Sequence, residues 1–353
     1  MSTDRWNVIL DERSARVHPV VVAEIGMNHD GSVGLATRLI DAAAECGADV
    51  VKFQVHVAEA ETLPDAPNPP YFNNESRVAY FHRTAFDLET WRGLKARAEQ
   101  HGVGFLASAF CTEAVRLLDV LGVDAYKVPS GEVTNLAFLS EVAAQRKPVL
   151  LSSGMSNLAE LDAAVRTIRQ QHDRLILLQC TSEYPCPVDR VGLNLLDDLR
   201  QRYGRPVGLL DHTMTNYAAF AAVALGACVI EKHFTLSRRM YGSDAAHSLE
   251  PAEFAELVRG IQAIDTMLSR PVDKNDLARV QDMKRVFEKS LVTTCDIPAG
   301  TTIATHMIGV KKPGTGISAA RLHDVIGRRA TRRIAAHTVL GETDVEWAGG
   351  QRS

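Results

Sequence analysis

Two histidines in the second half of the chain are the residues that indicate chemistry most directly. His212 follows the apolar run that begins at Val207, and His233 follows the run that begins at Cys228. If these runs are adjacent strands of a parallel barrel, both imidazoles point into the barrel mouth, where such folds hold their active sites. Two histidines with water or substrate oxygens make an open metal site, whereas a closed structural zinc site needs four protein ligands. The alternative interpretation is two unrelated polar residues at strand ends.

Polar residues also lie at the ends of other apolar runs. These residues are Glu24, Lys52, Gln54, Ser108, Lys127, Ser130 and Ser152. In a barrel their side chains converge on one cavity, and two ammonium groups with several hydroxyls suit a small phosphorylated or carboxylated ligand. Either lysine alone could instead be a buried ion-pair partner. Together with the hydroxyl groups, the two lysines favour an anion site.

The elements that must position these residues are short apolar runs that alternate with helical patterns. The runs span residues 20–25, 49–54, 104–108, 125–129, 149–152, 175–180, 207–211 and 228–233. Gly47, Gly102, Gly122 and Gly226 lie where the intervening helices should stop. Continuous apolar strands alternating with helices indicate a parallel sheet covered by helices. Eight repeats predict an α/β fold with a closed (β/α)8 TIM barrel.

Two segments depart from this alternation. Residues 57–86 form a long stretch rich in Pro, Asn and Tyr without a strong period, and we expect a functional loop that partly covers the barrel mouth. After Leu268 the barrel pattern ends. We expect a barrel domain over residues 1–268, a linker over 269–286 and a small β-rich domain over 287–353.

Composition excludes several classes of function. The chain has 353 residues, 46% of them hydrophobic, and a formal net charge of −4 with charges of both signs mixed throughout, which indicates neither a nucleic-acid nor a membrane surface. Residues 1–17 are polar and lack the apolar core of a signal peptide. The 6 cysteines form no C-x-x-C pair. We therefore expect a cytoplasmic protein with reduced thiols.

A set of short motifs, taken in order, resembles a known family. The motifs are AEIGMNHDG at residues 23–31, VVKFQ at 50–54, YKVPSGE at 126–132, LLSSGMS at 150–156, CTSEYP at 180–185, DHT at 211–213 and EKHFTL at 231–236. Together they resemble the sialic acid synthase family, which condenses phosphoenolpyruvate with an aldehyde sugar. The resemblance covers nearly the whole chain, because the segment around residues 310–316 is similar to the antifreeze-like (SAF) module of these enzymes.

The resemblance implies a role for each of these residues. It implies that Glu24 is the catalytic acid or base. It also implies that His212 and His233 bind a divalent metal, for which Mn²⁺ is expected first and Mg²⁺ or Co²⁺ are the alternatives. The phosphoenolpyruvate contacts would be Lys52, Ser108, Lys127, Ser130 and Ser152. The acceptor contacts would be Gln54, Tyr184, Asp244 and Lys312. It also implies a homodimer in which the SAF module of one subunit caps the active site of the other.

Three positions depart from the family pattern and concern the acceptor. Gln179 stands where relatives often carry His, Leu210 where they usually carry Ser, and Lys312 where sialic acid synthases carry Arg. Lysine does not reproduce the planar fork of arginine. The metal and phosphoenolpyruvate half is therefore expected to be intact, and the acceptor is expected to be an aldose close to those of legionaminate or pseudaminate synthases.

Two other functions compete with the synthase. Lys127 on a barrel strand could form an imine with pyruvate, as in a Schiff-base aldolase, a mechanism that does not need the histidines. A carbohydrate-binding protein without catalysis would use the C-terminal module alone. The presence of Glu24, His212 and His233 argues against the binding protein.

Overall fold

The computed structural model describes residues 3–11, 18–68 and 75–347. The chain divides into two compact units, Met1–Pro271 and Val272–Ser353. Part of the N-terminal segment used in the signal-peptide argument lies outside the described residues, as do residues 69–74 of the expected loop. Within the described ranges no helix is both long and apolar enough to cross a membrane.

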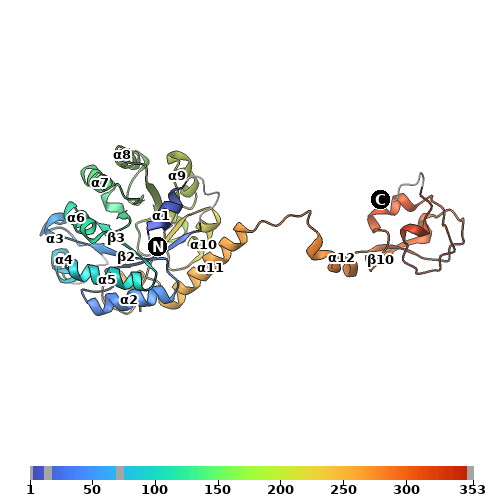
Figure 1. Ribbon diagram of the computed structural model, residues 1–353, viewed down its shortest axis with the longest axis horizontal. Coiled ribbons are helices and arrows are strands. Elements are labelled where there is room, and N and C mark those ends of the chain that lie inside the picture. Colours follow the sequence, from blue (N-terminus) through green and yellow to red (C-terminus); the bar gives the residue numbers. More distant parts are fainter. Residues whose placement is uncertain (1–2, 12–17, 69–74, 348–353) are drawn as a thin grey trace. The chain divides into compact units, whose positions relative to one another are not determined.

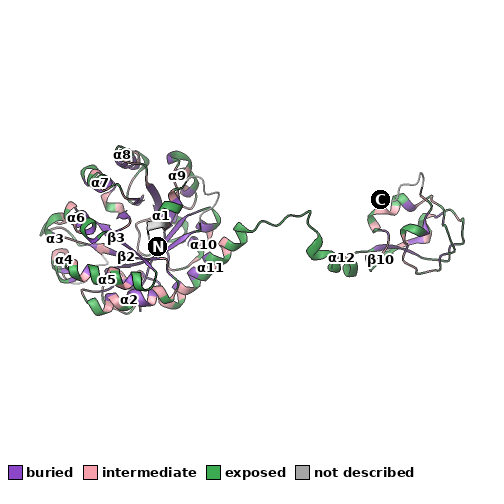
Figure 2. Cartoon of the chain, viewed as in Figure 1, coloured by how far each residue is buried: buried purple, intermediate pink, exposed green. Residues whose placement is uncertain are grey.

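The first unit is a closed barrel of parallel strands, as the sequence pattern predicts (Figure 1). The strands, paired in chain order with β1 closing on β8, are β1 (Val20–Gly26), β2 (Val50–Val55), β3 (Gly104–Ala109), β4 (Tyr126–Val128), β5 (Val149–Ser152), β6 (Leu175–Cys180), β7 (Val207–Leu210) and β8 (Val229–His233). Every residue of these strands except Gln54 is buried, and Figure 2 shows the buried centre. Both faces are covered, which explains the uninterrupted apolar runs.

Helices surround the strands (Figure 1). They are α1 (Thr3–Leu10), α2 (Val33–Glu45), α3 (Ala58–Glu61), α4 (Arg77–Thr84), α5 (Leu88–Gln100), α6 (Thr112–Leu121), α7 (Leu136–Ala144), α8 (Leu158–Arg169), α9 (Leu195–Tyr203), α10 (Tyr217–Ala224) and α11 (Pro251–Ser269). The four glycines predicted to stop helices all have positive φ, from +71° to +89°. Trp6 and Ile9 of α1 pack with the apolar residues inside the barrel, so α1 closes the end opposite the mouth.

The segment over residues 57–86 corrects one expectation. It is not irregular throughout, because it contains the short helices α3 and α4. Ser76 caps α4 by accepting a hydrogen bond from the Ala79 N–H, and Tyr80 and Phe81 bury its apolar side. The helical signal of α4 spans only two turns after a proline-rich stretch, which is too short to stand out as a period. We call residues 57–86 the α3–α4 segment.

The second unit is small and β-rich, as predicted. It contains the antiparallel strands β9 (Ser290–Thr293) and β10 (Ile308–Lys311), together with the helices α12 (Gln281–Phe287) and α13 (Leu322–Val325). Its own apolar core includes Leu291, Ile303 and Leu340. The stretch expected as a linker, residues 269–286, includes most of α12.

A glycine in β7 shows how closely the strands pack. A Cβ at Gly208 would lie 2.5 Å from the Val229 carbonyl oxygen and 2.7 Å from Leu178 Cδ2. Gly208→Ala should therefore lower the free energy of unfolding by about 1–3 kcal/mol, since backbone on β8 must move. Gly93→Ala, at an exposed helical site with open space, is the matched control and should raise it by about 0.5–1 kcal/mol. Urea unfolding of the full chain measures both; equal effects would contradict this account.

Candidate active site

The strand ends and the loops that follow them enclose a cavity of about 410 Å³. This is the size of a ligand site for a small molecule. Ten of the twelve residues predicted for the site line it: Glu24, Lys52, Gln54, Ser108, Lys127, Ser130, Tyr184, His212, His233 and Asp244. Ser152 is fully buried but does not line the cavity, and Lys312 belongs to the second unit.

Glu24 reaches the mouth because β1 is irregular at its end. The register against β2 shifts between Glu24 and Gly26, and Gly26 has φ +54°. A Cβ at Gly26 would lie 2.5 Å from Asp244 Oδ2, so the close approach of the loop after β8 requires glycine there. Asp244 in turn accepts a hydrogen bond from the Met27 N–H at 3.2 Å. The two acidic side chains therefore lie side by side at the end of β1.

Two lysines and two glutamates form a buried ion network below the cavity. Lys52 Nζ lies 2.8 Å from Glu24 Oε2 and 3.4 Å from Glu231 Oε1, and Lys127 Nζ lies 3.2 Å from the same oxygen of Glu231. Each of these four side chains is at most 2% exposed. Lys52 also donates to Ser108 Oγ at 2.9 Å. Both predicted anion-binding lysines are thus also ion-pair partners, the alternative that the sequence left open.

Burial and pairing shift the pKa values of this network in different directions. Burial alone would lower the pKa of Lys52, but the carboxylates of Glu231 and Glu24 outweigh it and raise that pKa. For Lys127 burial prevails over the attraction of Glu231, and its pKa is lowered. Burial would raise the pKa of Glu231, but Lys127 and Lys52 outweigh it and lower that pKa. Glu231 is therefore held as a carboxylate between two ammonium groups.

His212 and His233 lie next to each other, with ring centroids 5.5 Å apart. Nδ1 of His212 donates to the Thr181 carbonyl oxygen at 2.8 Å, which leaves the lone pair on Nε2. This Nε2 and Nδ1 of His233 are buried without a hydrogen-bond partner among the described residues. Burial, and then His233, lower the pKa of His212 to about 3, so its ring is neutral. A neutral His212 with an unused lone pair on Nε2, beside His233, fits a divalent metal.

The two histidines are not part of a larger cluster of metal-binding side chains in the described part of the chain. Among the described residues, no group of three or more His, Cys, Asp or Glu side chains is arranged to hold a metal ion. Asp244 Oδ2 lies 4.0 Å from His233 Nδ1, next to the pair. His212 and His233, the two ligands expected from the sequence, thus lie side by side on the wall of the cavity.

Lys232 holds the loop that carries His212. Its buried ammonium lies 2.9 Å from Asp211 Oδ2 and donates to the carbonyl oxygens of Thr213 at 2.5 Å and Thr215 at 2.9 Å. Asp211 also accepts from the Thr213 N–H at 2.8 Å. These contacts fix the turn after β7 and thereby the direction of the His212 side chain.

The cavity includes residues that the sequence analysis missed. Glu61, Arg77 and Tyr80 reach it from the α3–α4 segment, and Glu132 lies in the 3-10 turn after β4. The polar character of residues 57–86 indicated a cover over the mouth, but no spacing in that segment identified individual side chains. The position of the segment supports the expected lid.

Of the three departures from the family pattern, Gln179 and Lys312 do not line the cavity. Gln179 donates to the Val191 carbonyl oxygen at 3.1 Å and accepts from Ser153 Oγ at 3.1 Å, so it holds the loops after β5 and β6. Gln179 is therefore a residue that orders two loops and does not line the cavity. Leu210 does line the cavity. In the second unit, Lys312 Nζ lies 4.8 Å from the ring centroid of Phe287.

Similar proteins of known identity cover most of this chain. An N,N'-diacetyllegionaminic acid synthase of Campylobacter jejuni is 36% identical over 92% of this chain and 99% of its own length. The N-acetylneuraminate-9-phosphate synthase of Mus musculus is 34% identical over 93% of both chains. The solved N-acetylneuraminic acid synthetase of Leptospira borgpetersenii, in complex with citrate, is 30% identical, covers 75% of this chain and 90% of its own, and superposes with a TM-score of 0.66.

Two family matches divide the chain where the structure does. Residues 39–273 match the NeuB family, and residues 288–346 match the SAF domain. The NeuB match covers the barrel from α2 onward, and the SAF match covers the small β-rich unit. This chain therefore belongs to the NeuB family of nonulosonic acid synthases and carries a C-terminal SAF domain.

Proposed function

We propose that this protein condenses phosphoenolpyruvate with an aldose to give a 2-keto-3-deoxy sugar acid of the nonulosonate type and phosphate. The observation that carries the proposal is the buried network of Glu24, Lys52, Glu231 and Lys127 directly beside the two open histidines. The site thus combines a carboxylate for proton transfer, two ammonium groups for an anion and a place for a metal.

Charge balance supports a divalent metal at His212 and His233. Five carboxylates but only three lysine or arginine side chains line the cavity: Glu24, Glu61, Glu132, Glu231 and Asp244 against Lys52, Lys127 and Arg77. An anion with a phosphate and a carboxylate would be repelled by this excess unless a cation is added. We propose Mn²⁺, with Mg²⁺ and Co²⁺ as alternatives, because neutral imidazoles and oxygen ligands suit such ions. The metal would act as a Lewis acid on the acceptor carbonyl.

The chain's own residues would then position the reactants. Lys52 and Lys127, with Ser108 and Ser130, bind the phosphate and carboxylate and hold C3 of phosphoenolpyruvate against the acceptor carbonyl. A bond forms from C3 to that carbonyl carbon, water adds at C2, and the C2–O bond to phosphate breaks. Glu24, fixed by Lys52 and Gln54, exchanges a proton with the water or with the new alkoxide. Ser152, buried behind the cavity, is kept as a weaker candidate contact.

The acceptor class follows from the relatives. Two N,N'-diacetyllegionaminic acid synthases are 36% and 34% identical to this chain, and the pseudaminic acid synthases are 28–29% identical. Phosphoenolpyruvate contributes no nitrogen, so both acetamido groups of a diacetylated product come from the acceptor. We propose a six-carbon aldose with acetamido groups, bound by Gln54, Tyr184 and Asp244. Leu210 adds an apolar contact to the same wall of the cavity.

Phosphate release tests the reaction. The chain should release phosphate from phosphoenolpyruvate with Mn²⁺ and an acetamido aldose, and ¹⁸O in the C2–O bridge should leave with the phosphate. Glu24→Gln should reduce turnover on the order of 10²–10⁴-fold while ligand binding largely survives, since the side chain keeps its shape but loses proton transfer. Label kept in the keto acid would contradict the proposal. So would a borohydride-trapped adduct of pyruvate on Lys127, the amine whose pKa burial lowers.

Metal removal tests the histidine pair. EDTA should abolish phosphate release and Mn²⁺ should restore it. His233→Ala should weaken Mn²⁺ binding in calorimetry by about 10–100-fold or more, because one of two protein ligands is lost. His101→Ala, which removes a histidine paired with Asp41 far from the barrel mouth in the fold, is the control and should bind Mn²⁺ as the unmodified protein does. Full metal content in His233→Ala would overturn the assignment.

We further propose a homodimer in which the SAF domain of one subunit caps the active site of the other. The stretch between the barrel and the SAF domain supports a partner surface, because it exposes large apolar side chains. These are Met267, Leu268, Val272, Leu277, Val280, Met283, Val286 and Phe287, each at least 42% exposed. Isolated apolar residues on a surface are ordinary, but a run of this length favours an interface. Lys312 is the residue of the SAF domain proposed to contact the acceptor.

Mixed dimers test the shared site. Lys312→Ala and Glu24→Gln should each be nearly inactive, and mixing them should restore part of the activity, because subunit exchange produces one site with both changes and one site with neither. Native mass spectrometry measures the exchange, and phosphate release measures the recovery. Exchange without recovery would mean that each SAF domain serves its own barrel or none.

A further inference from the structure

A chain of hydrogen bonds leads from Glu24 to the α3–α4 segment. Gln54 Nε2 donates to Glu24 Oε1 at 2.8 Å, and Gln54 Oε1 lies 3.1 Å from Nε2 of His56. Nδ1 of His56 lies 2.6 Å from Glu61 Oε1 on α3. The chain thus joins β1, β2 and the first helix over the barrel mouth. Neither His56 nor Glu61 has a role in the proposed reaction.

Lys52 determines the direction of every bond in this chain. Because its ammonium lies 2.8 Å from Glu24 Oε2, Glu24 is a carboxylate and can only accept hydrogen bonds. Gln54 must therefore turn its NH2 group toward Glu24 and its oxygen toward His56. An oxygen can only accept, so Nε2 of His56 carries a proton and donates it.

The other ring nitrogen of His56, Nδ1, contacts Glu61. A separation of 2.6 Å between Nδ1 and Glu61 Oε1 requires a hydrogen between them, since two lone pairs at that distance repel. One proton is therefore shared by the His56–Glu61 pair, in addition to the proton on Nε2. The two side chains are only 6% and 7% exposed, so water does not replace these bonds.

Aromatic rings hold the His56 ring in this orientation. Phe81 of α4 stacks on one face with centroids 3.8 Å apart, and Phe110, which follows β3, stacks at 4.1 Å. The ring cannot tilt between these contacts without losing the bond to Gln54. Packing from α4 and from the loop after β3 therefore sets the direction in which Gln54 presents its amide.

We propose that His56, supported by Glu61, is a positioning residue that locks the Gln54 amide with its NH2 group toward Glu24. The proposal rests on the function proposed above, in which Glu24 exchanges a proton. An amide does not pass protons readily, so the chain orients the carboxylate and is not a proton wire.

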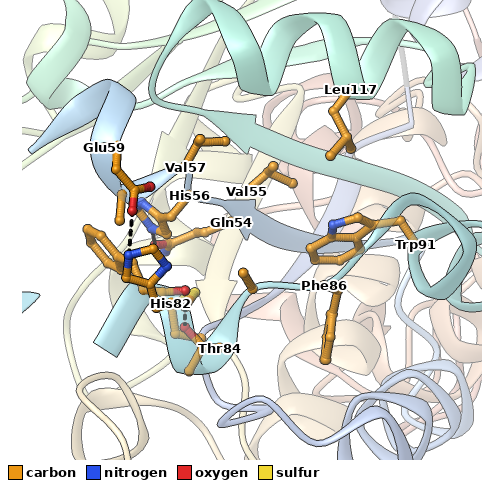
Figure 3. A pocket seen from close by; sticks show the side chains of 14 residues that line it. Gln54, Val55, His56, Val57, Glu59, His82, Thr84, Phe86, Trp91 and Leu117 are labelled. Atoms are coloured by element: carbon orange, nitrogen blue, oxygen red, sulfur yellow. Dashed lines mark hydrogen bonds and ion pairs between the residues drawn. The ribbon is translucent and has the colours of Figure 1, made fainter. Parts of the chain in front are cut away.

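A second histidine pair nearby provides a matched control. His82 of α4 and Glu59 of α3 also lie 2.6 Å apart, but they are 54% and 69% exposed. Figure 3 shows His56, Glu59 and His82 on a pocket of about 170 Å³, with the Glu59–His82 pair marked by a dashed line. Only His56 is bonded to Gln54. The same substitution at the two positions therefore separates positioning from general support of the segment.

The kinetic test compares His56→Phe with His82→Phe in the full-length protein. Phenylalanine keeps the aromatic stack of residue 56 and removes both hydrogen bonds. His56→Phe should lower kcat by on the order of tenfold or more, with KM for phosphoenolpyruvate changed by less than about threefold, because orientation and not binding is lost. His82→Phe should keep both constants within about twofold. Equal losses in the two variants, or a change in KM alone, would overturn the proposal.

A spectroscopic test does not depend on activity or on how well the variant folds. The unmodified protein is labelled with ¹⁵N-histidine. The His56 resonances are assigned by comparison with His56→Phe or by through-space contacts to Phe81 and Phe110. They should show Nε2 protonated and Nδ1 in a short hydrogen bond. An unprotonated Nε2 would overturn the proposal whatever the reaction. Protein that shows the expected resonances but releases no phosphate with any aldose would instead disprove the proposed function and leave the hydrogen-bond chain established.

Discussion

The buried ion network at the barrel mouth is the constraint on which the rest of the site depends. Lys52 and Lys127 together with Glu24 and Glu231 have almost no access to water, so each charge requires its partners within about 3 Å. Burying charges is expensive, and removing one partner from such a group is strongly destabilising. The network is therefore poor as a source of stability but effective at fixing the positions of four side chains from β1, β2, β4 and β8. An arriving anion meets ammonium groups that are already oriented.

The same network determines the polarity of its surroundings. Because Glu24 accepts from both the Lys52 ammonium and the Gln54 amide NH2, Gln54 turns its oxygen toward His56, and His56 in turn contacts Glu61. On the opposite side, Lys232 holds the turn that carries His212, and Nδ1 of His212 donates to the Thr181 carbonyl oxygen. The lone pair on Nε2 of His212 is therefore directed away from the backbone. The residues proposed to bind phosphoenolpyruvate and metal lie at strand ends and in the turns directly after them. The residues proposed to bind the acceptor, Gln54, Tyr184 and Asp244, come from β2 and from the loops after β6 and β8.

Prediction from the sequence succeeded where the pattern was long and repeated, and failed where it was local. The eight apolar runs predicted the strands of the barrel, because a strand buried on both faces leaves an uninterrupted apolar stretch. Strand-end polar residues then had to converge, so most of the candidate site follows from topology alone. Helix α4 was missed because two turns carry too little periodicity. The place of Gln179 could not be predicted from the family pattern, because its bond to the loop carbonyl of Val191 depends on how two distant loops meet.

By itself, the sequence determined the fold class, the order of the strands and the two-unit organisation, since these follow from the hydrophobic pattern and from chain order. The motifs identified most of the residues that gather at the mouth. Only the tertiary structure decided which charges are paired, which side chains of the α3–α4 segment reach the cavity, and which atoms donate. The physical reason is that hydrogen-bond direction and ion pairing depend on distances of a few tenths of an ångström between residues far apart in the chain. Glu24 and Glu231 are separated by most of the barrel sequence, yet they share one ammonium group.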